Sequence, residues 1–164
     1  MKNASIPPPL NTGDDLRNQY GAICWRMLRG RVQVLLITSR DTGRWVIPKG
    51  WPMEGLSPAQ CAAQEAFEEA GVMGQVSDTC LGMFAYDKAL VRGPGPEASS
   101  VPCMVAVYAL QVSRMVDRYP EAGQRRRKWF TCPKAAERVA EPELQVLLAA
   151  FVPQPDAASP AAQA

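Results

Sequence analysis

The sequence predicts a single α/β domain, in which a central mixed β-sheet is covered on both faces by helices. Its 164 residues, 47% of them hydrophobic, fit one compact domain with its own core. Segments with helical periodicity alternate with β-branched and aromatic segments, and two of the latter flank a short turn. We expect the domain to cover residues 16–152, between a flexible segment at 1–15 and a disordered tail at 153–164, because both ends are rich in proline and small residues.

The first strands follow directly from composition. Gln19 to Leu28 and Val32 to Thr38 are predicted strands, and Arg29-Gly30-Arg31 between them predicts a hairpin turn. Trp45 to Ile47 is a short third strand. The next segment, Pro48 to Pro52, should leave the sheet and loop over its edge, because proline has no N–H for a ladder.

A helix is predicted between Ser57 and Gly71. Ser57 is a good N-cap, Pro58 suits the first helical position, and Gln60 stands where a capping box needs it. Gly71 is the natural end of the helix. Five alanines at helical spacing predict a face that lies close against the sheet: Ala59, Ala62, Ala63, Ala66 and Ala70.

The second half of the chain predicts further strands and two helices. The predicted strands are Val72 to Val76, Cys80 to Lys88, Val101 to Ser113 and Lys128 to Thr131, and the predicted helices are Pro133 to Val139 and Pro142 to Phe151. Residues 91–97 are too rich in glycine and proline to be regular, so this loop is a candidate substrate lid.

Three carboxylates share one face of the predicted helix. Glu65, Glu68 and Glu69 fall within an arc of roughly 100°, which is the relation of i, i+3 and i+4 positions. Two such carboxylates about 6 Å apart repel by roughly 3 kcal/mol at an effective dielectric near 20. The face therefore calls for a counter-cation, and its oxygen ligands favour Mg²⁺ or Mn²⁺.

Composition excludes several other chemistries. The chain has no histidine, which removes serine and cysteine triads, imidazole bases and the usual zinc sites, so hydrolysis must use carboxylates. Its five cysteines form no CxxC pair, as expected of buried thiols in a reducing cytosol. With no targeting segment and no apolar run of about 18 residues, we expect a soluble, cytoplasmic protein with no membrane partner. The net charge of +2 argues against a global nucleic-acid surface.

These residues resemble the signature of the Nudix hydrolase family: Gly, five residues, Glu, seven residues, then Arg-Glu-aliphatic-any-Glu-Glu-any-Gly-aliphatic. Gly50 opens it, and the positions in register are Glu65, Ala66, Glu68, Glu69, Gly71 and Val72. Leu56 and Gln64 replace a glutamate and an arginine that form a bracing salt bridge in the family. Since both partners are lost, no charge is left unpaired, and we interpret the change as a coordinated structural one.

The resemblance extends over roughly residues 18–151. An aromatic-rich first strand, Arg44-Trp45 before the loop, and a basic run entering Trp129-Phe130 are most similar to the diphosphoinositol polyphosphate phosphohydrolase and dinucleoside polyphosphate hydrolase group. The family implies a Nudix-type α/β/α sandwich and the attack of water on phosphorus within a diphosphate linkage.

The resemblance also implies roles for individual residues. Glu65, Glu68 and Glu69, with the carbonyl of Gly50, would hold Mg²⁺ or Mn²⁺, and Glu69 or Glu65 would orient or deprotonate water. Glu97 and Glu121 are rival bases on predicted loops. Candidate substrate-binding cations by motif position are Arg26, Arg40, Lys49 and Lys88.

Four consecutive cations, Arg125 to Lys128, precede Trp129. Alternate residues of a strand share a face, so at most two of the four should face a substrate, and we choose Arg125 and Arg127. Such a run is also typical of a solvated edge or a nucleic-acid patch.

The sequence thus predicts a metal-dependent hydrolase of a phosphoanhydride bond. Its expected partner is a small polyphosphorylated substrate such as a diphosphoinositol polyphosphate or a dinucleoside polyphosphate. Two alternatives stay open. One is a non-catalytic ligand-binding Nudix module, suggested by Leu56 and Gln64, and the other is an RNA 5′-pyrophosphohydrolase, suggested by the basic run. No feature favours or excludes a dimer.

Overall fold

A computed structural model describes residues 17–91 and 99–154 of the chain. Seven strands form one sheet in the order β3-β2-β1-β6-β5, with β4 paired to β1 and β7 paired to β2. The strands are β1 (Arg17–Leu28), β2 (Arg31–Thr38), β3 (Trp45–Val46), β4 (Lys49–Gly50), β5 (Val72–Val91), β6 (Ser99–Met115) and β7 (Arg127–Thr131); the helices are α1 (Pro58–Ala70), α2 (Cys132–Arg138) and α3 (Pro142–Ala149).

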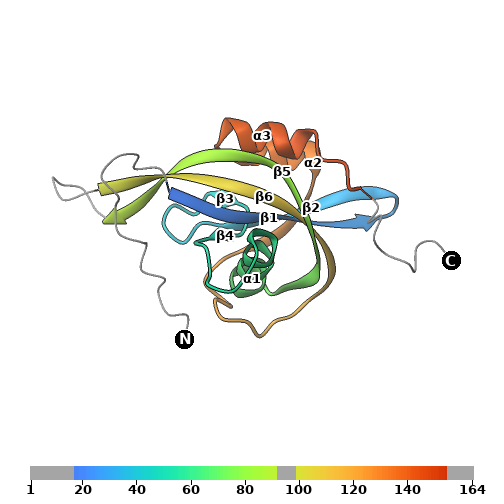
Figure 1. Ribbon diagram of the computed structural model, residues 1–164. Coiled ribbons are helices and arrows are strands. Elements are labelled where there is room, and N and C mark those ends of the chain that lie inside the picture. Colours follow the sequence, from blue (N-terminus) through green and yellow to red (C-terminus); the bar gives the residue numbers. More distant parts are fainter. Residues whose placement is uncertain (1–16, 92–98, 155–164) are drawn as a thin grey trace.

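The helices lie on both faces of the sheet, with α1 on one side and α2 and α3 on the other (Figure 1). The predicted α/β/α sandwich is therefore confirmed. Three predicted segments lie wholly or mostly outside the described residues: the flexible segment 1–15, the tail 153–164 and the candidate lid 91–97. The predictions for these segments and for the exact domain limits therefore stay predictions.

The middle of the sheet is mixed. β1 pairs antiparallel with β2, for example at Trp25 and Val34, and parallel with β6, from Arg17 opposite Cys103 to Trp25 opposite Gln111. Parallel neighbours need a long crossover connection, and here the part of the chain that runs from β2 to β5 connects β1 to β6. β1 is thereby fixed in the centre of the sheet.

The segment after β3 does not simply leave the sheet. Lys49 and Gly50 form β4, which pairs antiparallel with Gly21 and Tyr20, so the expectation of a loop was wrong at these two residues. Proline lacks a donor, yet its carbonyl still accepts, and that of Pro48 receives the N–H of Ala22 at 3.0 Å. The pairing seats Gly50 against the central strand.

The two strands expected at 72–76 and 80–88 form one strand, β5. Its register with β6 shifts between Met73 and Gly74, between Val76 and Cys80, and between Cys80 and Gly82. Such β-bulges place extra residues on one strand without ending it. Residues 77–79, which separate the two predicted strands, therefore lie in a bulge within β5.

Helix α1 begins and ends as predicted. Ser57 and Gln60 form the capping box, and Gly71 has φ +67°, in the left-handed region that favours glycine. A Cβ on Gly71 would also collide with the carbonyl oxygen of Val116 and the ring of Tyr119. Four of the five alanines are fully buried against the sheet: Ala59, Ala62, Ala66 and Ala70.

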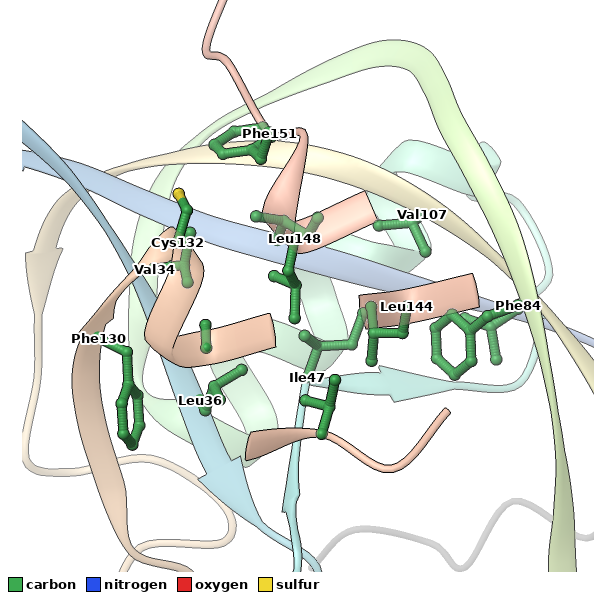
Figure 2. Packing of buried hydrophobic residues seen from close by; sticks show 14 residues of the cluster. Val34, Leu36, Ile47, Phe84, Val107, Phe130, Cys132, Leu144, Leu148 and Phe151 are labelled. Carbon is green, nitrogen blue, oxygen red and sulfur yellow. The ribbon is translucent and has the colours of Figure 1, made fainter. Parts of the chain in front are cut away.

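A second core fills the space between the sheet and helices α2 and α3 (Figure 2). Leu144 and Leu148 of α3 are completely buried there, with Phe84 of β5, Ile47 and Val107 around them. The two helices thus cover one face of the sheet while α1 covers the other.

Within residues 17–91 and 99–154, no helix is long and apolar enough to cross a membrane.

Candidate active site

The three glutamates of α1 lie deeper than the sequence suggests. The sequence places them on one helix face, and in the structure Glu65 is 2% exposed, Glu69 is 5% exposed and Glu68 is half-buried. Glu65 and Glu69 are one helical turn apart on α1, a helix that packs against β1 and β4. Buried carboxylates need partners, because an isolated buried charge is costly.

The first partner element is the backbone of β4. A Cβ atom added to Gly50 would collide with the carboxylate carbon and Oε1 of Glu65. The strand and the helix therefore touch at a point where only glycine fits, and this point is the Gly50–Glu65 contact that the sequence assigned to metal binding. The contact forms because β4 stays in the sheet.

The second partner is Arg125, just before β7. Its Nη2 lies 3.4 Å from Oε2 of Glu69 and 3.1 Å from Oε1 of Glu121, and its Nη1 donates to the carbonyl of Thr38 at 3.1 Å. The Arg125 side chain is only 10% exposed. The structure thus brings this predicted substrate-binding residue to the carboxylates themselves.

Glu121 is a fourth carboxylate of the group. It is 2% exposed, and its backbone N–H donates to the carbonyl of Glu68 at 3.0 Å, which fixes the loop to α1. Arg40, itself half exposed, lies 3.4 Å from the Glu121 carboxylate. Of the two rival bases named from sequence, Glu121 reaches the site, and Glu97 lies outside the described residues.

Two predicted lysines lie beside aromatic rings near this group. The Lys49 amine is 4.7 Å from the ring centre of Tyr86, and the Lys88 amine is 5.9 Å from that of Trp51. Burial lowers the pKa of Lys49, and the nearby charge of Glu69 opposes this by stabilising the ammonium. Lys49 is therefore within electrostatic reach of the carboxylates.

Arg17, which no sequence motif singles out, acts together with the two lysines. It stands opposite Cys103 in the β1–β6 register and is 9% exposed. Burial raises the pKa of the Cys103 thiol, while Lys88, Lys49 and Arg17 all act in the opposite direction. Three cations therefore lower the pKa of one buried thiol, and the crossover pairing of β1 with β6 is what sets Arg17 opposite Cys103.

Two predicted cations have other partners. Arg26 lies over the ring of Trp129, with its guanidinium carbon 4.1 Å from the ring centre. Its guanidinium also donates to the side-chain oxygen of Gln33 at 2.9 and 3.0 Å. Arg127 donates to the carbonyls of Ala70 and Val116 at 3.0 and 3.1 Å. The structure places the first on the β1–β2 hairpin and makes the second an anchor of the loop after β6.

Helix α1 holds its preceding loop without the family's Glu–Arg pair. Leu56 is 41% exposed, and the Cys61 thiol accepts the N–H of Met53 at 3.3 Å. The same sulfur lies 4.0 and 3.9 Å from the carbonyls of Met53 and Leu56. Weak thiol contacts and the capping box thus hold the loop in place of that salt bridge, and no sequence motif signals this role for Cys61.

A divalent cation fits the chemistry of these donors. Among residues 17–91 and 99–154, no three acidic or cysteine side chains already form a metal cage. Mg²⁺ is usually held by only one or two carboxylates and keeps several waters, so a closed cage is not required. The close Gly50–Glu65 contact supplies a carboxylate beside a backbone strand, and Glu69 adds a second carboxylate one turn on.

Comparison with known proteins identifies the family. The NUDIX domain model matches residues 17–151. The chain is 36% identical over 112 residues to Nudix hydrolase 16, mitochondrial, of Arabidopsis thaliana, covering 68% of this chain and 60% of that protein. It is 26% identical over 119 residues to human diphosphoinositol polyphosphate phosphohydrolase 3-alpha, covering 71% and 65%. The matches thus span about 60% of the length of these curated relatives.

Solved structures share the fold. The C. elegans Ap4A hydrolase superposes with a TM-score of 0.55 at 19% identity, covering 82% of this chain and 94% of that one. The E. coli dihydroneopterin triphosphate pyrophosphohydrolase superposes with a TM-score of 0.60 at 17% identity, with the same coverage. At these identities the likeness establishes the architecture.

Proposed function

This chain belongs to the Nudix hydrolase family, and from that premise we propose that it hydrolyses a diphosphate linkage in a small polyphosphorylated molecule. One observation carries the proposal: Glu65 and Glu69 are held buried on α1, the first against the backbone of Gly50 and the second beside Arg125 and Glu121. A helix face that served only solubility would leave its carboxylates in water.

The residues divide into two roles. Glu65 and Glu69, with Glu68 and the Gly50 carbonyl, would hold Mg²⁺ or Mn²⁺. When bound, such an ion neutralises phosphate oxygens and acidifies a bound water. Glu69 or Glu65 would orient or deprotonate the attacking water, and Glu121 is a third candidate, because it shares the Arg125 guanidinium with Glu69.

The substrate class follows from the cations. Lys49, Lys88 and Arg17 all act on the Cys103 thiol, Lys49 also interacts with Glu69, and the rings of Tyr86 and Trp51 lie beneath the two lysines. Ammonium and guanidinium groups bind phosphates, and aromatic rings suit a base or a sugar ring. We therefore rank diphosphoinositol polyphosphates and dinucleoside polyphosphates ahead of nucleoside triphosphates, and propose the cytoplasm as the location.

The two alternatives rest on fewer observations. The loss of the Glu–Arg pair at Leu56 and Gln64 suggested a module without turnover, but the Cys61 contacts and the capping box offer another means of holding the loop. In the basic run, Arg125 and Arg127 turn to the loop and helix, which leaves Arg126 and Lys128 exposed for an RNA backbone.

Phosphate release with added Mg²⁺ tests the proposal, measured with and without pyrophosphatase. The substrates are an inositol pyrophosphate, diadenosine polyphosphates, nucleoside triphosphates, nucleotide sugars and triphosphorylated RNA, and the control is the Glu69→Gln variant. We expect turnover of an inositol pyrophosphate or a diadenosine polyphosphate that the variant lacks. Turnover of RNA alone would favour the RNA alternative, and binding without turnover in folded protein would favour the non-catalytic module.

A further inference from the structure

Arg125 connects three separate parts of the chain. Its guanidinium contacts the Thr38 carbonyl at the end of β2, the Glu121 carboxylate in the loop after β6, and the Glu69 carboxylate on α1. Nη1 makes the first contact and Nη2 makes the other two. Nε has no hydrogen-bond partner within the described ranges. The planar fork is thus placed so that one nitrogen faces both carboxylates.

Burial makes this arrangement costly to lose. The side chains of Arg125, Glu69 and Glu121 are 10%, 6% and 2% exposed. Charges this far from water persist only when they are paired, and the two carboxylates would otherwise repel each other. The guanidinium therefore sets the distance between Glu69 and Glu121 before any ligand arrives. It leaves little of its own surface for a substrate.

Arg127 provides a comparison within the same segment. It ties the same loop to the same helix through the carbonyls of Ala70 and Val116. Its ion-pair partner is Asp117, whose side chain is 99% exposed. Arg127 is thus a loop anchor that contacts no glutamate of the site, whereas Arg125 contacts two.

We propose that Arg125 is a positioning residue that fixes Glu69 and Glu121 relative to each other, so that a metal ligand on α1 and a candidate base in the loop after β6 keep one fixed arrangement. It does not bind substrate, in contrast to the expectation from the basic run. The inference rests on the proposed function, which makes Glu69 a ligand of the cation and Glu121 a candidate base. A lysine cannot make all three contacts in this geometry, because its single ammonium replaces the two guanidinium nitrogens that reach the Thr38 carbonyl and the two carboxylates.

The test compares Arg125→Lys with Arg127→Lys as the matched control. Mn²⁺ binding is measured on metal-free protein from the electron paramagnetic resonance signal of free Mn²⁺, together with the Tm. Loss of a residue that orients a metal ligand typically costs 10–100-fold in metal affinity or activity. We expect Arg125→Lys to weaken Mn²⁺ binding about tenfold or more, and Arg127→Lys to keep it within about twofold.

A second variant, Arg125→Gln, covers the case in which Arg125→Lys does not fold. Removing a positive charge would by itself tighten the binding of a cation, so weaker Mn²⁺ binding in this variant reports lost geometry. Equal Mn²⁺ binding in the Arg125 and Arg127 variants would overturn the proposal and leave Arg125 as a loop anchor.

Steady-state kinetics with Mg²⁺ separates positioning from substrate contact. We expect kcat of Arg125→Lys to fall about tenfold or more with KM nearly unchanged, because the substrate groups are untouched. A higher KM with kcat retained would overturn the proposal in favour of substrate binding. Wild-type protein that binds Mn²⁺ but turns over no substrate would refute the proposed function alone, since the Mn²⁺ comparison still decides the role of Arg125. Wild-type protein that binds no Mn²⁺ would refute both.

Discussion

The backbone of Gly50 lies directly against the carboxylate of Glu65, with no room for a side chain between them. The two residues come from different elements, β4 and α1, and the contact exists because β4 pairs with the central strand. A short strand of two residues thereby sets how close a buried carboxylate comes to a second backbone. A single added carbon atom, the Cβ of any other residue at position 50, would disrupt this contact.

Gly50→Ala tests that contact. The added methyl group must displace the Glu65 carboxylate, so we expect Mn²⁺ binding and kcat to fall about tenfold or more while the sheet still forms. Titration with Mn²⁺ and circular dichroism measure the two effects. The control is Gly43→Ala, where the added Cβ meets no atom within 4 Å but strains a backbone with φ +69°, so this variant reports what a loss of stability alone does to Mn²⁺ binding. Unchanged Mn²⁺ binding in Gly50→Ala would contradict this account.

Glu69→Gln tests the helix face. The change keeps the volume and removes the charge, so we expect at least about a hundredfold loss of Mg²⁺-dependent turnover in protein that remains folded. Phosphate release and the thermal transition are the measurements. A variant that keeps both activity and metal affinity would show that the assignment of this face is wrong.

Restoring the family pair, by Leu56→Glu with Gln64→Arg, should affect stability more than rate. Leu56 is 41% exposed and the loop is already held through Cys61 and the capping box, so a new surface pair would add about 0.2–1 kcal/mol. Denaturant unfolding and kcat on the same protein measure both. A large rise in kcat would instead identify the missing pair as a functional defect.

Arg26→Met should affect stability and leave substrate affinity alone. The stack on Trp129 is worth about 0.5–1 kcal/mol, so we expect the Tm to fall by about 2–4 °C and KM to stay within about twofold. Lys49→Met is the contrasting variant, because Lys49 is electrostatically coupled to Glu69. If KM rises as much for Arg26→Met as for Lys49→Met, Arg26 binds substrate, as the sequence predicted.

Alkaline pH should destabilise the protein through buried thiols. Burial, helped by the nearby Glu69 charge, raises the pKa of Cys24 from 9.0 to about 12. The unfolded chain releases this proton first, so stability is fully present below pH 9 and is lost as pH rises toward 12. The loss is about 2 kcal/mol by about pH 10.5. Urea unfolding of Cys24→Ala should show a shallower decline than Cys80→Ala, whose thiol is exposed.

Local signals in the sequence predicted the elements well. Helix α1 follows from Ser57, Pro58 and Gly71, each of which acts within a few residues of its own position. The break expected within β5 was wrong because polar residues can be absorbed by a bulge, and a bulge depends on the partner strand. The strand at Lys49–Gly50 was missed for the same reason: its pairing partner is almost thirty residues away in sequence.

The site residues also fall into those that local sequence patterns predict and those that they do not. The glutamates of α1 stand out because helical spacing is local, whereas the roles of Arg125, Arg17 and Cys61 depend on tertiary contacts. Arg125 seemed a free cation in a basic run, and only the return of the loop to α1 shows that Glu69 and Glu121 surround it. Arg17 gains its neighbours from the crossover that sets β1 beside β6.

The parallel pairing of β1 with β6 also has a consequence for how the chain folds. Arg17 must find Cys103, and Trp25 must find Gln111, so the centre of the sheet closes a loop of more than eighty residues. On the ribosome, the β1–β2 hairpin would form early and wait with one edge uncovered until β6 has been synthesised. Loop closure of this length slows folding and exposes strand edges to other chains. Expression at reduced temperature, or a chaperone that shields the hairpin, should therefore raise the yield of folded protein.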